Sequence, residues 1–182
     1  SGFDWETVER SRADAKRRQA TNPDAYVRAE ADFLVLAETR LINSALFRHA
    51  VDQTIGAVQE LRRLAEESGI RLILLVTPHN QHYLDRFRRV DIEYFLERLA
   101  DIAPFWNFAS YSSVTTDDSN YYETSHHRPA IGAMVAARVG ESRAGDIPDD
   151  FGRWVTPENV GAVLEELRPQ FAERARAGLR GD

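Results

Sequence analysis

The residues best suited to chemistry lie in the short stretch from Tyr121 to His127. Within it, Glu123 precedes His126 by three residues, just ahead of a segment that favours a helix. A carboxylate can orient an imidazole and stabilise its charged form, and the imidazole can then act as general base toward a hydroxyl. The spacing predicts His126 as base and Glu123 as its acid. Because this spacing is common by chance, a histidine bonded locally at a helix start is the alternative interpretation.

Two apolar segments are expected to form the strands that position this pair. Residues 70–77 are almost continuously apolar, which is typical of a parallel strand covered on both faces, and Pro78 ends them. Residues 105–108 form the second expected strand. An intervening helix, capped by Asp91, makes the unit a strand–helix–strand crossover, which in one sheet is normally parallel and right-handed.

The ends of the two strands predict which distant residues meet. Ligands bind open parallel sheets outside the carboxyl ends of the strands. The first strand runs into His79 and Asn80, and the second runs into the polar loop that carries Glu123 and His126. We therefore expect these four residues to converge, with His79 and Asn80 close to the substrate.

Further helix boundaries follow from residues with special backbone preferences. Ser44 is expected to cap a long helix that Gly69 ends, and Pro129 is expected to open a helix that Gly140 ends. Pro169 is expected to kink or interrupt the last helix.

The histidines also allow a metal site, with carboxylates completing it. The residues available for it are His79, His82, His126, His127, Glu123 and Asp118. The sequence has no helical His-x-x-x-His or His-Glu-x-x-His motif and no Gly-rich phosphate loop. We therefore expect no metal and no cofactor, and keep a His/carboxylate metal site as an alternative.

The length and patterning of the chain predict one domain over residues 1–182. Its expected parts are a helical N-terminal region over 1–43, an α/β core over 44–140, and a connector with a C-terminal helix over 141–182. Two strands are few for a free-standing parallel sheet. Strands hidden in the first half, a mostly helical chain and a fragment of a longer protein are the alternatives.

Composition excludes several classes of function. The net charge of −6 argues against a general affinity for nucleic acid. No apolar run reaches the ~20 residues that span a membrane, so membrane contact is expected only through an anchor upstream of this chain. There is no cysteine, which excludes thiolate nucleophiles, disulfides and cysteine-ligated zinc. The compartment stays open.

Several of these segments, taken in order, resemble a known family. The series is Gly69–His79, Phe105–Phe108, Tyr122–His126, the helix through Gly132, Phe151–Gly152 and Thr156–Asn159. It resembles the C-terminal half of SGNH-type hydrolase-like proteins, especially bacterial surface and exopolysaccharide-associated members. The resemblance covers roughly Ala50 to Leu167.

The resemblance implies a three-layer α/β/α, flavodoxin-like parallel sheet, incomplete here and preceded by a helical part. It implies ester hydrolysis or acyl transfer, often on acylated carbohydrate, with a serine nucleophile and an acid-x-x-His base. His126 matches the base and Glu123 the acid, although the usual acid is the shorter Asp. No metal is implied.

The nucleophile of the family has no counterpart in the chain. The Gly-x-Ser turn and the oxyanion-hole Gly and Asn are not matched. None of the available serines considered lies in a strand-to-helix turn: Ser44, Ser110, Ser112 and Ser113. We therefore expect this chain alone to be inactive as an esterase. A non-catalytic module that binds saccharide or protein during envelope or exopolysaccharide assembly is the second hypothesis.

Overall fold

The structure is a computed structural model that describes residues 10, 13–14, 17–18, 20–22, 24–29, 43–140 and 147–177. Much of the expected helical region over 1–43, and part of the connector that begins at residue 141, lie outside the described residues. The elements from residue 44 onward follow in this order: α3 (Ser44–Glu67), β1 (Leu74–Val76), α4 (Gln81–Leu84), α5 (Arg89–Ala100), β2 (Phe105–Asn107), the 3-10 helix η1 (Asp118–Asn120), α6 (Pro129–Val139), β3 (Arg153–Val155) and α7 (Val160–Arg176).

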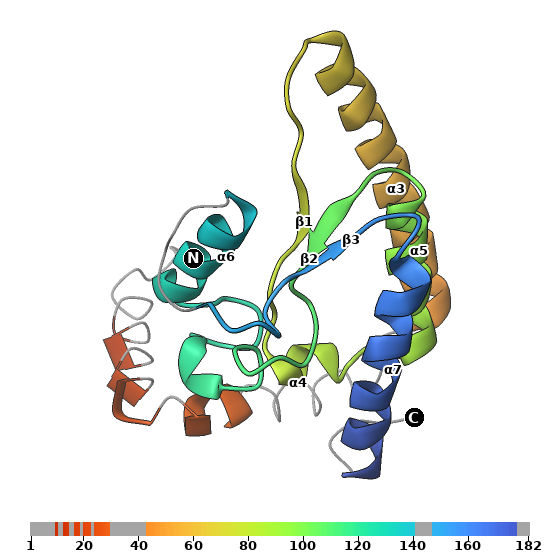
Figure 1. Ribbon diagram of the computed structural model, residues 1–182. Coiled ribbons are helices and arrows are strands. Elements are labelled where there is room, and N and C mark those ends of the chain that lie inside the picture. The colour runs from red at the N-terminus through yellow and green to blue at the C-terminus, as the bar shows by residue number, and fades with distance from the viewer. Residues whose placement is uncertain are drawn as a thin grey trace, which may run out of the picture.

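The three described strands form one mixed sheet in the order β1-β2-β3 (Figure 1). Strands β1 and β2 are parallel, with Leu74 opposite Phe105, and α5 connects them as the sequence predicts. Strand β3 is antiparallel to β2, with Val155 opposite Phe105. No sequence pattern predicts β3, because it is only three residues long and two of them, Arg153 and Trp154, are exposed.

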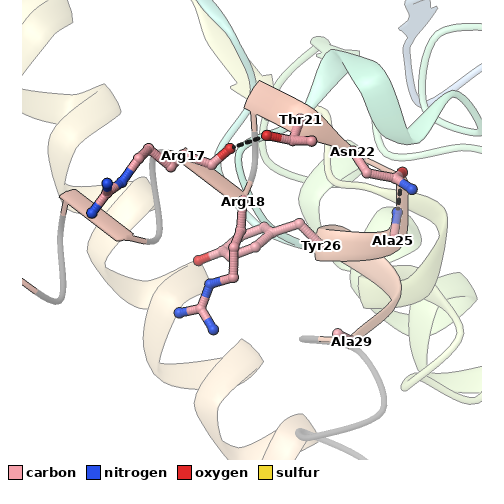
Figure 2. A pocket seen from close by; sticks show the side chains of 7 residues that line it. All are labelled: Arg17, Arg18, Thr21, Asn22, Ala25, Tyr26 and Ala29. Atoms are coloured by element: carbon pink, nitrogen blue, oxygen red, sulfur yellow. Dashed lines mark hydrogen bonds between the residues drawn. The ribbon is translucent and has the colours of Figure 1, made fainter.

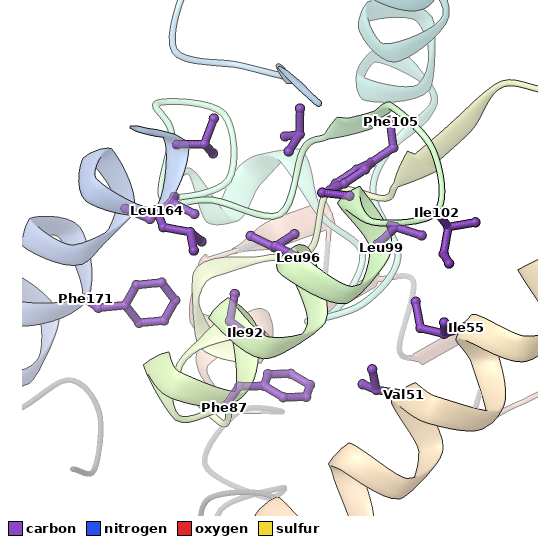
Figure 3. Close-up of a cluster of buried hydrophobic side chains, with 14 residues drawn as sticks. Val51, Ile55, Phe87, Ile92, Leu96, Leu99, Ile102, Phe105, Leu164 and Phe171 are labelled. Atoms are coloured by element: carbon purple, nitrogen blue, oxygen red, sulfur yellow. The ribbon is translucent and has the colours of Figure 1, made fainter. Parts of the chain in front are cut away.

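Helices cover both sides of this sheet, so the described chain is mixed α/β. Helices α3, α5 and α7 lie on one side and α6 lies on the other (Figure 1). The larger core cluster joins α3, α5 and α7 to the sheet (Figure 3). Its members include Ile55, Leu96, Phe105, Leu164 and Phe171. A second cluster packs α6 through Ile131 against residues that follow β2 and precede β3, including Phe108, Val114 and Phe151.

The sheet is covered less completely than the sequence predicts. The expected strand over 70–77 is reduced to Leu74–Val76, and Leu75 in its middle is 39% exposed. Leu75 belongs to neither core cluster, whereas its neighbour Trp106 packs against the α6 cluster. The expectation of burial on both faces is therefore wrong for β1, because α6 packs against the sheet at Trp106 of β2 and does not cover Leu75 of β1.

Two predicted helix caps are wrong because their side chains serve a contact between helices. The side chain of Asn43, rather than that of Ser44, caps α3 by accepting from two backbone amides. The Ser44 hydroxyl instead donates to Asp91 at 2.5 Å, and Arg48 donates to the same carboxylate at 2.9 Å. Asp91 lies buried in the first turn of α5, which follows Arg88 without a side-chain cap.

The other predicted boundaries agree better with the structure. Gly69 follows the end of α3 with a φ of 65°, Pro129 opens α6 and Gly140 closes it. Pro169, however, lies inside α7, which continues through it to Arg176. Proline removes one helical hydrogen bond, and the row of apolar side chains that α7 buries stabilises the helix in spite of this loss. None of the described helices is both long and apolar enough to cross a membrane.

Candidate functional site

The turn after β1 begins the site. Asn80 caps α4, because its side-chain oxygen accepts the backbone amide of His82 at 2.9 Å. Its side-chain nitrogen donates to Asp118 at 2.9 Å. Asn80 has no exposed surface. It therefore influences the site through the backbone that it holds, while the neighbouring His79 is only partly buried.

This turn is bonded directly to the loop that carries the acid–base pair. The amide of Asn80 donates to the carbonyl oxygen of Thr124 at 3.1 Å, and the amide of Gln81 donates to that of Thr115 at 2.9 Å. The loop therefore lies against the carboxyl end of β1. This contact brings His79 and Asn80 next to Glu123 and His126, as the two strand ends predict.

Asp118 links the two segments from inside the loop. Its carboxylate is 4% exposed and accepts from the side chains of Asn80 and, at 3.3 Å, of Gln81. His82 Nε2 lies 3.5 Å from the same carboxylate, and Arg28 Nε lies 3.4 Å from it. Burial raises the pKa of Asp118, but the two amide bonds and His82 outweigh that effect and bring the pKa below its ordinary value.

The Glu123 carboxylate contacts His126 at Nδ1, the nitrogen that an orienting acid engages. The backbone amide of Ser125 donates to the same carboxylate at 2.8 Å, and the Ser125 hydroxyl donates to it at 3.0 Å. The extra methylene of glutamate therefore does not prevent the contact with His126. The Glu123 side chain is 22% exposed and that of His126 is 80% exposed.

The electrostatics of the pair agree with this arrangement. Burial raises the pKa of Glu123, but the bonds from the Ser125 amide, His126 and the Ser125 hydroxyl together lower it by more. The net pKa of Glu123 therefore lies below its ordinary value. Glu123 is therefore ionised at neutral pH. Among the described residues, Nε2 of His126 has no hydrogen-bond partner, and the ring that carries it is largely in solvent.

His79 lies close to Glu123 and His126. Its ring stacks on Tyr83 with the centroids 4.4 Å apart, and its Nε2 lies 3.2 Å from the Thr77 hydroxyl. Burial lowers the pKa of His79, while the Ser125 backbone and the charge of Glu123 oppose that shift without cancelling it. The charges of His126 and His127 lower it further. A neutral imidazole therefore stands next to the acid–base pair.

His82 and His127 have contacts of their own in this region. His82 faces Asp118, and His127 Nδ1 lies 3.2 Å from the backbone carbonyl of Arg128. Across the described ranges, no three His, Asp or Glu side chains are grouped so as to hold a metal ion. The predicted set of histidines and carboxylates therefore lies in one region without forming a metal-ligand arrangement.

Ser44, Ser112 and Ser113, three of the serines considered as nucleophiles, bond partners away from His126. Ser112 is buried against Thr115, and the Ser113 hydroxyl donates to Asp150 at 2.8 Å. The Ser125 hydroxyl is 3.2 Å from Nδ1 of His126, which is the nitrogen already engaged by Glu123. No hydroxyl in the described part of the chain bonds Nε2, so a nucleophile for His126 is not found there.

Two contacts in this region were not expected from the sequence: Ser125 bonds the Glu123 carboxylate, and Arg128 lies over Tyr122. Ser125 follows Glu123 by two residues, a spacing at which a side-chain oxygen often bonds the backbone of a turn, and this is the signal that could have revealed it. The Arg128 guanidinium lies over the Tyr122 ring, 4.8 Å from its centroid. No local pattern in the sequence indicates that contact.

A separate hollow of about 820 Å³ lies near the N-terminal end of the chain (Figure 2). Its lining consists of Arg17, Arg18, Thr21, Asn22, Ala25, Tyr26 and Ala29. Within it the Thr21 hydroxyl donates to the Arg17 carbonyl at 2.8 Å, and the Asn22 side chain accepts the Ala25 amide at 3.1 Å. Its described lining has no carboxylate or imidazole.

Comparison with protein-family models, with curated proteins and with solved structures finds no match for this chain. The geometry around His126 and Glu123 therefore carries the functional argument.

Proposed function

We propose that this protein supplies the base and the acid of a serine-type esterase or O-acyltransferase, acting on an ester or acylated carbohydrate as SGNH-type hydrolases do. One observation carries the proposal. Glu123 engages Nδ1 of an exposed histidine, which leaves Nε2 of His126 available to a hydroxyl. The nucleophile is supplied from outside the described residues.

In such a reaction Nε2 of His126 takes the proton of the nucleophilic hydroxyl as its oxygen bonds the acyl carbon. The same proton then passes to the leaving alcohol as the ester bond breaks. Water, or an acceptor hydroxyl in acyl transfer, releases the acyl group by the reverse proton path. Glu123 holds the ring and stabilises the imidazolium that forms in each step.

The position of the site in the fold supports the proposal. The acid–base loop lies against the carboxyl end of β1, which pairs in parallel with β2, and open parallel sheets bind ligands at this edge. Helices on both sides of the sheet agree with a three-layer, flavodoxin-like arrangement, which is part of the proposal.

Acetate release from O-acetylated xylan by the native full-length protein tests the proposal. We expect His126→Ala to lower kcat on the order of 10³-fold or more. The matched control is His49→Ala, which removes an exposed histidine from α3 and is expected to keep the wild-type rate. A folded His126→Ala protein with wild-type turnover would rule out the role of His126.

A non-catalytic role is the second candidate, and one observation favours it. Within the described ranges no hydroxyl reaches Nε2 of His126. A scaffold without a nucleophile would bind saccharide without turnover, and His126→Ala would leave that affinity unchanged. Titration calorimetry with deacetylated xylan, run beside the acetate assay, separates the two candidates. Binding without acetate release favours the non-catalytic role, and acetate release that depends on His126 favours the catalytic one.

A further inference from the structure

Arg128 is the cation closest in sequence to the acid–base pair, and its side chain is held in two places. Its Nε donates to the carbonyl oxygen of Ser119 at 2.8 Å. The Cζ atom of its guanidinium group lies over the ring of Tyr122, 4.8 Å from the centroid. Cation–π contact and a backbone hydrogen bond together order a side chain that would otherwise sample many rotamers.

The ends of the same guanidinium are not used within the described part of the chain. Other arginines there, such as Arg48 and Arg174, form ion pairs with carboxylates. Arg128 forms no ion pair with a described carboxylate, and no described group accepts from its two terminal nitrogens. An ordered arginine with free terminal donors offers the fork that binds carboxylate or phosphate oxygens.

Backbone bonds tie this fork to the base. The Tyr122 amide donates to the carbonyl oxygen of His126 at 2.8 Å, and the Arg128 amide donates to that of Asn120 at 2.8 Å. An isolated β-bridge between Tyr121 and His127 lies between these two bonds. Arg128, Tyr122 and His126 are therefore parts of one closed loop. Both aromatic ring and imidazole are exposed, Tyr122 by 39%.

We infer that Arg128, supported by Tyr122, binds an oxyanion carried by the substrate whose acyl group His126 acts on. The substrate class is an acylated saccharide that bears a carboxylate or a phosphate. The exposed ring of Tyr122 offers apolar surface to the sugar beside that anion. The inference rests on the proposed function for the identity of the bound molecule, whereas anion binding itself needs no nucleophile and no turnover.

Titration calorimetry at low salt with three probes tests the inference: digalacturonate, galactose 6-phosphate and neutral lactose. We expect one of the anionic probes to bind about tenfold more tightly than lactose. One hydrogen bond to a charged group contributes a binding free energy that corresponds to a change in affinity of about this size. Whichever anion binds identifies the source of the oxyanion. Arg128→Gln is expected to remove the preference, and Arg128→Lys is expected to keep part of it, since lysine retains the charge without the fork.

Two matched variants make the outcome decisive. Arg71→Gln removes an exposed arginine far from this loop in sequence and is expected to keep the preference. His126→Ala is also expected to keep it, so failure of the catalytic proposal and failure of the anion site give different results. Equal affinity for lactose and both anions, or an unchanged preference in a folded Arg128→Gln protein, would overturn the inference.

Discussion

The backbone amide of Asn80 donates to the carbonyl oxygen of Thr124 at 3.1 Å. This bond joins the turn after β1 to the loop that places Glu123 against His126. Because Asp118 accepts from the Asn80 side chain as well, the turn and the loop are held by both backbone and side chain. This junction therefore fixes the backbone next to Glu123 against the turn after β1.

Asp118→Ala is expected to lower the free energy of unfolding by about 1–3 kcal/mol, because it leaves the buried side-chain nitrogen of Asn80 without an acceptor. Urea denaturation measures the loss. Asp101→Ala, at an exposed carboxylate after α5, is the control and is expected to stay within about 0.5 kcal/mol of wild type. Equal effects of the two variants would show that Asp118 does not hold the junction.

His79 is expected to make stability depend on pH in the range where histidines titrate. Its folded pKa lies below the unfolded value of about 6.5, so the unfolded chain binds more protons between the two values. Stability is therefore lost as the pH falls below about 6.5. Glu123, His126 and His127 are the charged groups that act on this ring.

The variant His79→Phe tests this dependence because it keeps a ring that can stack on Tyr83 but cannot take a proton. We expect a smaller difference in urea midpoint between pH 7.5 and pH 5.5 than in the wild type. His49→Phe, on the exposed surface of α3, should keep the wild-type difference. An unchanged pH dependence in His79→Phe would contradict the assignment.

Tyr121→Phe is expected to leave the free energy of unfolding unchanged or to raise it by about 1 kcal/mol. The Tyr121 hydroxyl is buried without a hydrogen-bond partner among the described residues, and burial raises its pKa. Removing an unpaired buried hydroxyl removes its desolvation penalty. Thermal and urea denaturation both report the change.

Tyr111→Phe is the contrasting variant, because the Tyr111 hydroxyl donates to Asp85 at 2.9 Å. Its loss is expected to cost about 1–2 kcal/mol, since the partner is a largely buried carboxylate. If Tyr121→Phe were the more destabilising of the two, the Tyr121 hydroxyl would have a bonding partner.

Gly152→Ala is expected to destabilise the protein by about 2–4 kcal/mol through backbone strain and overpacking. Gly152 has a φ of 87°, and a Cβ atom there would lie 2.4 Å from the Phe108 ring. Gly161 lies in α7 with no atom near an added methyl group, so Gly161→Ala is expected to raise the free energy of unfolding by up to about 1 kcal/mol. Effects of the same sign at both positions, read from urea midpoints, would disagree with this account.

The sequence by itself determined those features that depend on neighbouring residues. The apolar runs around Leu74 and Phe105 and the helix between them predicted the parallel pair, and Pro129 predicted the start of α6. The contact between Glu123 and His126 follows from a spacing of three residues in one loop. Short-range spacing and backbone preference carry such information without knowledge of the rest of the fold.

The tertiary structure alone decided the features that depend on partners distant in the chain. Asp91 became a partner of Ser44 rather than a cap, because α3 packs against α5. Leu75 is partly exposed because it packs in neither core cluster. Strand β3 exists because residues 153–155 pair with the edge of β2 that β1 leaves open. The Arg128 guanidinium lies over the Tyr122 ring because the loop closes on itself. Each outcome depends on which surfaces meet after folding, and a local pattern does not contain that information.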